Sequence, residues 1–197
     1  MQVNWPERIW VNSPVRRYVQ RREARFFKEH RDLPGSGRIL EIGCGNGFGA
    51  RLIAETFTPT LIVASDIDPK MLRSARRKMM SRGVTSMQVL AGDAQFLPCL
   101  DESFDAIFNF GIVHHLEDWQ TGIREVARVL KPGGAFYFEE IYPPLYANPL
   151  FRHILDHPRE NRFHGPQFRD RLAECGLFLQ PGYRESRFAI LGIAVKK

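Results

Sequence analysis

Residues 38–49, RILEIGCGNGFG, decide the fold class of this chain of 197 residues. The stretch begins as a short apolar strand and continues into a loop in which every second residue is glycine. Glycine lets a backbone turn sharply and approach a ligand closely. In a doubly wound α/β sheet, the loop after the first strand lies at the ligand-binding edge. The stretch therefore predicts such a sheet, with this loop at its binding site.

Strands and helices alternate after this loop. Further strands are expected at residues 60–65, 87–91, 104–110 and 135–141, with helices at 51–56, after Asp68 and after Asp118. This alternation predicts parallel strands with right-handed crossovers. Two later apolar runs, 177–180 and 188–195, leave no room for a helix between them and predict an antiparallel hairpin. The expected fold is α/β: a doubly wound, Rossmann-like sheet of about seven strands, mostly parallel with that C-terminal hairpin.

The composition is that of an ordinary globular protein. Hydrophobic residues make up 44% and charged residues 25%, which excludes a disordered or fibrous chain. Cys44, Cys99 and Cys175 are too few and too scattered for a disulfide framework or a zinc site, so we expect a reducing compartment and no metal. The N-terminus lacks a signal-peptide pattern, and no apolar run is long enough to span a membrane. These features predict a cytoplasmic protein.

Two regions carry the basic character behind the net charge of +6. Residues 14–31 hold seven Lys/Arg against two Glu, and residues 70–82 hold six Lys/Arg and no acid. Residues 1–37 are expected to form a helical cap, and residues 38–197 the main domain, with a lid-like insertion at 142–165. The cap helix, at 14–31, is predicted to be amphipathic, with a basic outer face. Its expected inner face is Val15, Tyr18, Val19, Phe26 and Phe27.

Acidic residues flank the glycine loop and end the neighbouring strands. Glu41 precedes Gly43 by two residues, where a negative charge suits a cationic ligand and opposes a pyrophosphate. Asp66 ends the second strand, where a carboxylate can accept both hydroxyls of a ribose. Asp93 follows the third strand, within reach of an adenine amine. A nicotinamide dehydrogenase is the alternative, since residues 45–50 fit G-x-G-x-x-A, but the terminal hairpin replaces the second half-site that a dinucleotide needs.

Five stretches together resemble the class I S-adenosylmethionine-dependent methyltransferases. They are residues 40–47, 65–72, 91–94, 103–107 and 129–134, in the family's order and spacing. The resemblance covers about residues 38–141 and is strongest to the small-molecule group similar to the ubiquinone/menaquinone methyltransferases. It implies an enzyme that uses S-adenosylmethionine as its cofactor.

The resemblance also implies a set of cofactor-binding residues at the ends of four strands. Small residues are needed in the glycine loop, and nothing indicates a reactive thiol there. The residues carried over are Glu41, Gly43 and Gly45 for the methionine part, with Cys44 in the same loop, Asp66 for the ribose, Ile67, Asp93 and Ala94 for the adenine, and Asn109 and Gly111 beside the sulfonium.

Methyl transfer is a displacement at sulfur, for which the protein aligns the acceptor, excludes water and takes up a proton where the acceptor must lose one. His114 and His115, after the fourth strand, are the candidate bases. The alternative is that they only shape the turn under the cofactor. Glu139 and Tyr142, with Glu140 between them, are candidate substrate contacts facing one crevice. The histidines of the lid-like insertion, His153, His157 and His164, complete no metal-binding motif.

The leading hypothesis is a methyltransferase for a small or lipophilic acceptor, with the N-terminal segment (Trp5, Trp10, Tyr18) and the insertion closing over the site. The alternatives are an RNA methyltransferase, suggested by the two basic helices, and a non-catalytic subunit that binds S-adenosylmethionine. Methylation of a nucleobase amine is disfavoured because residues 109–112, NFGI, replace the Asn-Pro-Pro-Tyr-like motif of that group. A basic amphipathic helix also allows contact with an anionic membrane. The acceptor, the methylated atom and the oligomeric state stay open.

Overall fold

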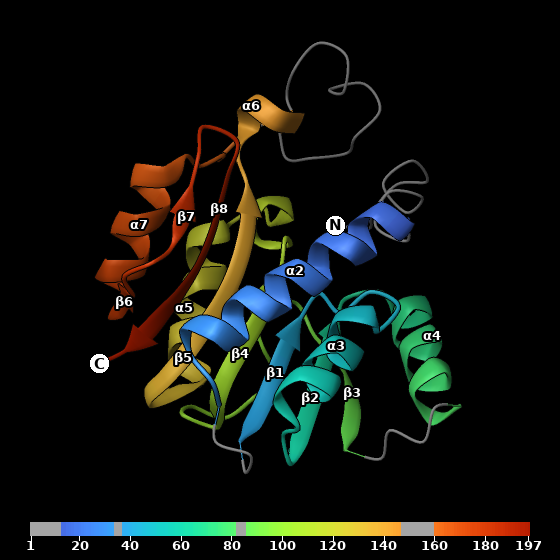
Figure 1. Cartoon of the computed structure of the whole chain (residues 1–197). Coiled ribbons are helices and arrows are strands. Elements are labelled where there is room, and N and C mark those ends of the chain that lie inside the picture. The colour runs from blue at the N-terminus through green and yellow to red at the C-terminus, as the bar shows by residue number, and fades with distance from the viewer. Residues whose placement is uncertain (1–12, 34–36, 82–85, 147–159) are drawn as a thin grey trace.

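A computed structural model describes residues 13–33, 37–81, 86–146 and 160–197. Its centre is a sheet of eight strands with the order β3-β2-β1-β4-β5-β8-β6, in which β7 pairs with β8 (Figure 1). The expected α/β class and the antiparallel C-terminal hairpin are confirmed, with eight strands instead of about seven. The additional strand is a two-residue pairing before β8. The strands are β1 (Arg38–Ile42), β2 (Leu61–Asp66), β3 (Met87–Ala91), β4 (Phe104–Phe110), β5 (Leu130–Ile141), β6 (Leu177–Leu179), β7 (Arg184–Glu185) and β8 (Ala189–Lys196).

Capping residues begin three of the helices. Ser13, Asp68 and Asp118 each accept a hydrogen bond from a backbone N–H of the first turn, which satisfies a donor that has no partner inside the helix. The helices are α2 (Pro14–His30), α3 (Phe48–Phe57), α4 (Pro69–Met80), the single 3₁₀ turn η1 (Val113–His115), α5 (Trp119–Val129), α6 (Pro143–Tyr146) and α7 (Gly165–Glu174). Among the described residues, none of these helices has the length and apolar character needed to cross a bilayer.

Alternation along the strands divides the core into two layers, one on each face of the sheet. Ile39, Phe108 and Tyr137 pack with α2, α3 and α4 on one face. Leu40 and Phe138 belong to the opposite core, which contains residues of α5 and α7. Strands β1 to β5 run parallel, so their carboxyl ends meet at one edge, at the top of Figure 1.

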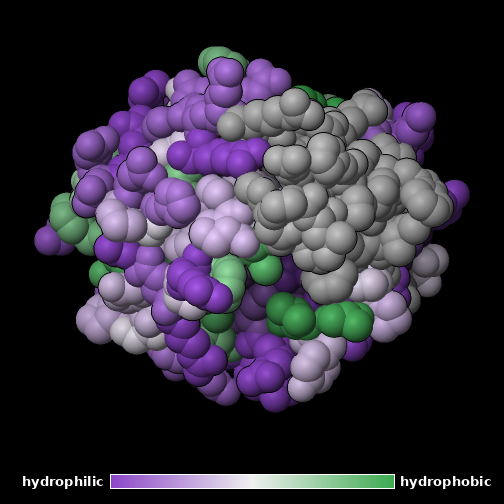
Figure 2. All heavy atoms as spheres, turned by 90° about the horizontal axis from the view of Figure 1, so that it is seen from above, coloured by the Kyte–Doolittle hydropathy of each residue, from purple (hydrophilic) through white to green (hydrophobic). Residues whose placement is uncertain are grey.

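The chain leaves β1 toward β2 on one side and later returns to place β4 on the other side. This reversal of strand order is the position where doubly wound sheets bind ligands. Figure 2 looks down on this edge and shows a described surface that is mostly hydrophilic, with small hydrophobic patches. The glycine loop after β1 therefore lies where the sequence predicts it.

Helix α2 differs from the expected amphipathic helix in its first half. Val15 and Tyr18, predicted to face inward, are 57% and 60% exposed, while Arg16 and Glu23 are buried. Further along, Phe27 is fully buried, as predicted. The prediction of the inner face is therefore wrong for the first two turns, because buried ion pairs replace apolar contacts there. Trp5, Trp10 and most of the lid-like insertion lie outside the described residues.

Candidate active site

The glycine loop has a left-handed backbone at three positions. The φ angles of Gly43, Gly45 and Gly47 are +67°, +51° and +82°, a conformation that strongly favours glycine. A Cβ atom on Gly43 would lie 2.3 Å from the side chain of Ile112, and one on Gly47 would lie 2.9 Å from Ala75. A Cβ atom on Gly45 would meet nothing within 4 Å. Gly43 and Gly47 thus pack the loop closely against its neighbours, and Gly45 borders open space.

Glu41 is buried beneath this loop. Its Oε2 atom has no hydrogen-bond partner in the part of the chain that the structure describes, and the backbone N–H of Ala50 donates to the carboxylate. Burial raises the pKa of Glu41 well above its usual range. A Cβ atom on Gly49 would lie 1.9 Å from Oε1 of Glu41, so glycine is needed there. An orphaned carboxylate oxygen fits a ligand that brings an ammonium group.

Asp66 joins the end of β2 to the glycine loop. Its Oδ2 accepts a hydrogen bond from the N–H of Gly45 at 2.8 Å, and its Oδ1 accepts one from the N–H of Asp68 at 2.8 Å. Burial raises the pKa of the Asp66 carboxyl. Ile67 follows with a side chain that is 47% exposed. A carboxylate beside an exposed apolar side chain suits a ribose carrying a flat base.

The remaining predicted residues of the loop and of β3 lie nearby in the fold. The N–H of Cys44 donates to the carbonyl of Ser65, which ties the loop to β2. Burial raises the pKa of the Cys44 thiol, so the thiol stays protonated and unreactive. Asp93 is partly exposed and accepts a hydrogen bond from the N–H of Gln95 at 2.8 Å, and Ala94 is buried. The residues at the ends of β1, β2 and β3 thus fit the cofactor that the resemblance implies.

Four donors surround Glu140, a buried carboxylate at the end of β5. Asn109 donates through Nδ2 at 2.5 Å, and the backbone N–H groups of Val113 and His114 donate at 2.7 and 3.1 Å. The fourth partner is Nδ1 of His114, at 2.5 Å from Oε2. When Glu140 is ionised it can only accept, and Nδ1 of His114 then carries the hydrogen. Asn109 is therefore bound to Glu140, and its Oδ1 holds the turn after β4 by accepting from the N–H of Ile112.

The environment of His114 keeps its ring neutral. Burial, with a smaller contribution from the charge of Arg16, lowers the pKa of His114 to about 3, and burial raises the pKa of Glu140 to about 7. His115 is half-buried, and its ring lies 4.2 Å from that of His114 between centroids. Among the described residues, Glu140 holds the ring of His114 through Nδ1.

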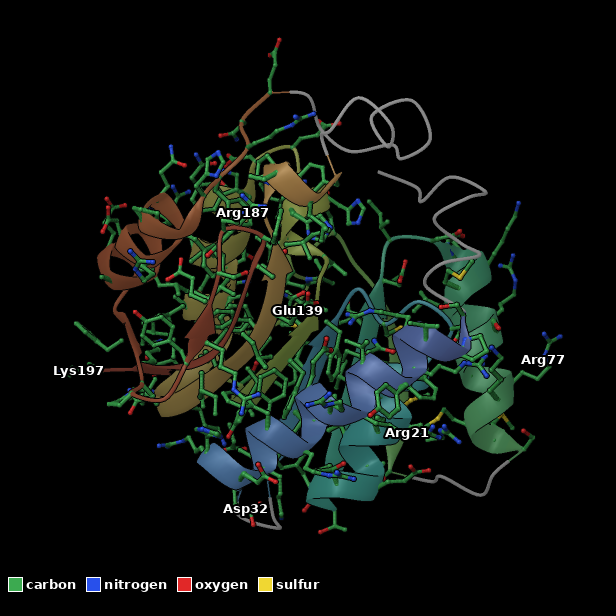
Figure 3. The ribbon with its side chains drawn as sticks, turned by 45° about the horizontal axis from the view of Figure 1, so that its top comes forward. Arg21, Asp32, Arg77, Glu139, Arg187 and Lys197 are labelled. Atoms are coloured by element: carbon green, nitrogen blue, oxygen red, sulfur yellow. The ribbon has the colours of Figure 1, made fainter. Side chains whose placement is uncertain are left out.

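Arg16 brings α2 into this edge of the sheet, which the sequence analysis did not predict. One guanidinium nitrogen lies 2.7 Å from Oε1 of Glu23, and the other donates to the carbonyl of Phe110 and to Oε2 of Glu139, both at 3.0 Å. Figure 3 shows Glu139 in the interior of the molecule and Arg21 on α2. No sequence signal separated Arg16 from the other arginines of the helix. Because its side chain is buried, Arg16 does not belong to the expected basic outer face of α2.

Gly111 lies between the histidine and arginine groups. Its φ is +78°, and a Cβ atom there would lie 2.9 Å from Oε2 of Glu139 and 3.5 Å from Cε1 of His114. Any side chain at Gly111 would therefore fill the space beside these two polar groups. Glu139, His114 and Arg16 thus lie close together around Gly111, at the carboxyl ends of β4 and β5.

Glu139 and Glu140 point to opposite faces of the sheet, because adjacent strand residues alternate. Glu139 pairs with α2, whereas Glu140 binds the turn after β4. Tyr142 is buried, and its hydroxyl donates to Glu185 at 2.9 Å. The interpretation that Glu139 and Glu140 face one crevice is therefore wrong, because adjacent strand residues alternate. Substrate contact by Glu139 and by Tyr142 stays a prediction.

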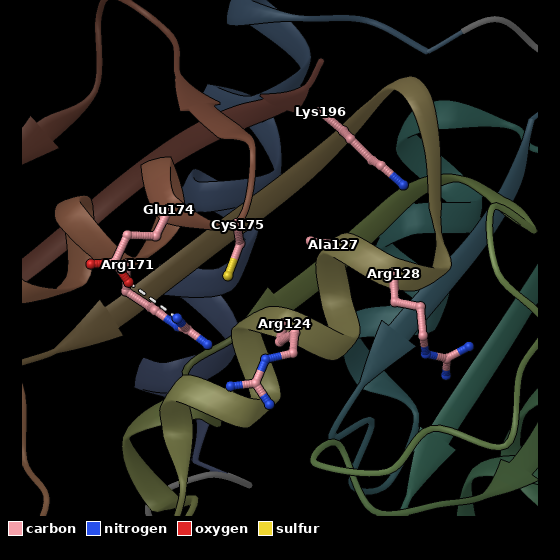
Figure 4. Close-up of a pocket in the computed structure, with 7 residues that line it drawn as sticks. All are labelled: Arg124, Ala127, Arg128, Arg171, Glu174, Cys175 and Lys196. Carbon is pink, nitrogen blue, oxygen red and sulfur yellow. Dashed lines mark hydrogen bonds and ion pairs between the residues drawn. The ribbon is translucent and has the colours of Figure 1, made fainter.

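A groove of about 360 Å³ lies between α5, α7 and β8, away from this edge (Figure 4). Arg124, Arg128, Arg171 and Lys196 line it, and their charged ends point in different directions. Arg128 pairs with Glu125, Arg171 pairs with Glu174, and Lys196 donates to the carbonyl of Leu130 at the amino end of β5. The groove therefore does not present converging, unpaired charges, and the candidate site remains at the carboxyl ends of the strands.

Comparison with known proteins identifies the family. A family model described as a methyltransferase domain matches residues 40–138. The chain belongs to this methyltransferase family. Membership implies S-adenosylmethionine as the cofactor, as the resemblance predicted. The matched residues include the glycine loop, the turn after β4 and most of β5.

The names of curated relatives of this chain specify a fatty acid and phthiotriol/phenolphthiotriol dimycocerosates. A fatty-acid O-methyltransferase of Mycolicibacterium smegmatis is 37% identical over 112 residues, which are 57% of this chain and 39% of that protein. A probable phthiotriol/phenolphthiotriol dimycocerosates methyltransferase of Mycobacterium ulcerans is also 37% identical over 112 residues, which are 57% of this chain and 42% of that protein. The chain thus spans about two fifths of the length of these relatives.

Solved structures share the fold over nearly the whole chain. A SAM-dependent methyltransferase from Aquifex aeolicus superposes with a TM-score of 0.77 at 19% identity, covering 98% of this chain and 100% of that one. The YcgJ protein of Bacillus superposes with a TM-score of 0.75 at 22% identity, covering 89% and 98%. At these identities the likeness establishes the methyltransferase fold alone.

Proposed function

We propose that the protein transfers the methyl group of S-adenosylmethionine to an oxygen of a small or lipophilic acceptor. The observation that carries methyl transfer is the buried carboxylate of Glu41, whose orphaned oxygen lies under a glycine loop that Asp66 holds from the next strand. Glu41 would bind the ammonium of the methionine part, and Asp66 the ribose hydroxyls. Ile67, Asp93 and Ala94 would surround the adenine.

The cofactor supplies an electrophilic methyl group on a sulfonium, and the chain supplies alignment and a proton acceptor. With hydrogen on Nδ1, the lone pair of a neutral His114 lies on Nε2. Because burial lowers the pKa of this ring to about 3, Nε2 would act as a base only while Glu140 is ionised beside the ring. The carboxylate of Glu140, 2.5 Å from Nδ1, would orient the ring and stabilise the imidazolium that forms when Nε2 takes the acceptor's proton. In this role Glu140 is a positioning residue, and His114 is the catalytic base.

The class of acceptor is supported by the names of the relatives, which specify a fatty acid and phthiotriol compounds. These acceptors have in common an oxygen nucleophile on a long apolar body. The described site fits an acceptor that presents a hydroxyl, because Glu139 and the Glu140–His114 pair are proton acceptors at the ends of β4 and β5. The RNA alternative loses Arg16 as a phosphate contact, since that side chain is buried.

The test is methyl transfer from labelled S-adenosylmethionine to a long-chain fatty acid, a long-chain alcohol and a structured RNA. We expect label in the lipid products, and His114→Gln should lower kcat by about 10²- to 10⁴-fold, the usual contribution of a general base. Binding of S-adenosylmethionine, measured by calorimetry, should change little. His115→Gln is the matched control and should have a much smaller effect on kcat.

Two results would overturn this function. Equal turnover by wild-type protein and His114→Gln would mean that the histidine only shapes the turn after β4. Cofactor binding without transfer to any acceptor would favour the non-catalytic subunit, and transfer to RNA alone would favour the RNA enzyme.

A further inference from the structure

The first two turns of α2 expose the residues that an amphipathic helix normally buries. Val15, Tyr18 and Val19 are 57%, 60% and 36% exposed, and they follow the i, i+3, i+4 spacing that places side chains on one side of a helix. Arg22 continues this side at i+7, and Arg25 lies one helical repeat beyond Tyr18. We call these five residues the α2 outer face.

Charge on this part of the surface has one sign. Arg16 and Glu23 are both buried, which leaves Glu29 as the one exposed acid of α2. Arg17 and Arg21 lie over the ring of Phe48 on α3, each 5.6 Å from its centroid. Arg22 and Arg25 are exposed. The α2 outer face therefore combines an apolar patch with arginines that have no exposed acid among them.

We propose that the α2 outer face docks on the surface of an anionic lipid bilayer. This inference rests on the proposed function, because a lipophilic acceptor resides in such a bilayer. Aromatic and aliphatic side chains enter the headgroup boundary while arginines bind anionic headgroups, and the α2 outer face offers both. An acidic protein would be complementary to the arginines, and it would leave the exposed Val15 and Tyr18 unexplained.

The orientation of α2 connects this docking surface to the active site. Arg16, which follows Val15 in the chain, points inward and reaches the carbonyl of Phe110 and the carboxylate of Glu139. One helical turn thus has an outward side on the α2 outer face and an inward side in contact with Phe110 and Glu139, at the strand ends where we place the acceptor. A bilayer against Val15 and Tyr18 would be held at the same helical turn that contacts these strand ends.

The test is co-sedimentation of the full chain with vesicles of phosphatidylcholine alone or of equal parts phosphatidylcholine and phosphatidylglycerol. We expect binding to the anionic vesicles only. Arg22→Glu with Arg25→Glu should weaken it by at least about 25-fold, taking about fivefold for each arginine near the surface. Val15→Ser with Tyr18→Ser should also weaken it, since apolar insertion is lost at unchanged charge. The matched control, Arg76→Glu with Arg77→Glu on the exposed side of α4, should retain binding.

The possible outcomes separate this inference from the proposed function. Absence of vesicle binding in a protein that still binds S-adenosylmethionine by calorimetry would overturn the docking surface alone. Equal losses from the α2 and α4 charge reversals would also overturn it, because binding would then follow net charge. Binding to soluble polyglutamate that matches vesicle binding and is insensitive to Val15→Ser with Tyr18→Ser would favour an acidic protein partner instead. If the wild-type protein binds anionic vesicles but does not bind S-adenosylmethionine, the proposed methyl transfer is wrong and the docking surface stands.

Discussion

The two sides of the ligand edge are built from different kinds of contact. On the side of β1, β2 and β3, each polar residue belongs to the end of its own strand, and Asp66 reaches Gly45 across neighbouring loops. On the side of β4 and β5, Glu139 is held by Arg16, a residue 123 positions away in the chain. We call these the cofactor side and the acceptor side, after the roles that we propose for them. The cofactor side is a local structure, whereas the acceptor side depends on how α2 packs on the sheet.

This difference implies that the two sides respond differently to mutation. A loop fixed by its own glycines and by a neighbouring carboxylate keeps its shape when a distant helix loosens. A buried cluster of one guanidinium and two carboxylates tolerates no missing partner, because a buried charge without its counter-charge is strongly unfavourable. Changes in α2 should therefore damage stability and acceptor binding before cofactor binding.

The largest expected effect is that of Arg16→Ala. The substitution leaves Glu23 and Glu139 buried without their cation, and breaking such a cluster costs about 3–5 kcal/mol of unfolding free energy. Urea denaturation measures it, with Arg22→Ala on the exposed side of the helix as the control, for which we expect a change within about 0.5 kcal/mol.

Arg16→Ala also tests whether the cofactor side and the acceptor side respond independently. At a temperature where Arg16→Ala is folded, its affinity for S-adenosylmethionine should stay close to that of the wild type, since the cofactor side makes no contact with Arg16 among the described residues. If the variant does not fold, Arg16→Lys keeps the charge but loses the forked geometry, and it should give a smaller loss of stability. A parallel loss of cofactor affinity and stability would show that the two sides are one unit.

The fold and the cofactor side could be predicted from the sequence for the same reason. Strand periodicity, caps such as Asp68 and the glycines of the loop act within a few residues, so a short stretch of sequence is enough to predict each of these elements. The five stretches of the family resemblance lie in these local elements. The prediction of a parallel sheet with an antiparallel hairpin followed from the absence of room for a crossover helix.

The acceptor side could not be predicted because its contacts are long-range and polar. Val15, Tyr18 and Val19 have the spacing of a buried stripe, and no sequence rule shows that Arg16 and Glu23 take their place in the core. The alternation of Glu139 and Glu140 follows from strand geometry, yet the sequence analysis assigned both to one crevice. Tyr142 likewise gave no sign that its hydroxyl would bind Glu185.

Asp66→Asn should have an intermediate effect, confined to the cofactor side. Hydrogen bonds to a charged acceptor are worth about 1.5–3 kcal/mol, so affinity for S-adenosylmethionine should fall by roughly 10- to 150-fold. Isothermal calorimetry measures it. Asp68→Asn removes the same charge two residues away while Asn still caps α4, and should change affinity much less. Unchanged affinity in Asp66→Asn would mean that the ribose binds elsewhere.

The smallest effect concerns the pH dependence of stability on the acceptor side. Burial and the negative charge of Glu139 raise the pKa of Glu23 from 4.5 to about 8, so the folded protein keeps a proton there that the unfolded chain has already lost. Stability from this group is present below the unfolded pKa and is lost as the pH rises toward 8, with a slope of at most about 1.4 kcal/mol per pH unit. His114 contributes little above about pH 7.5, because its pKa is about 3 when folded and near 6.5 when unfolded. The buried carboxyls of Glu41, Glu139 and Glu140 change stability in the same direction as Glu23, so the wild-type slope reports all four groups together.

Glu23→Gln separates Glu23 from the other three groups, because it keeps an oxygen for Arg16 and cannot titrate. Urea denaturation at several pH values up to about 8 should therefore show a shallower decline of the unfolding free energy with pH than in the wild type. Identical slopes would mean that Glu23 is ionised throughout, and that Arg16 balances both carboxylates at neutral pH.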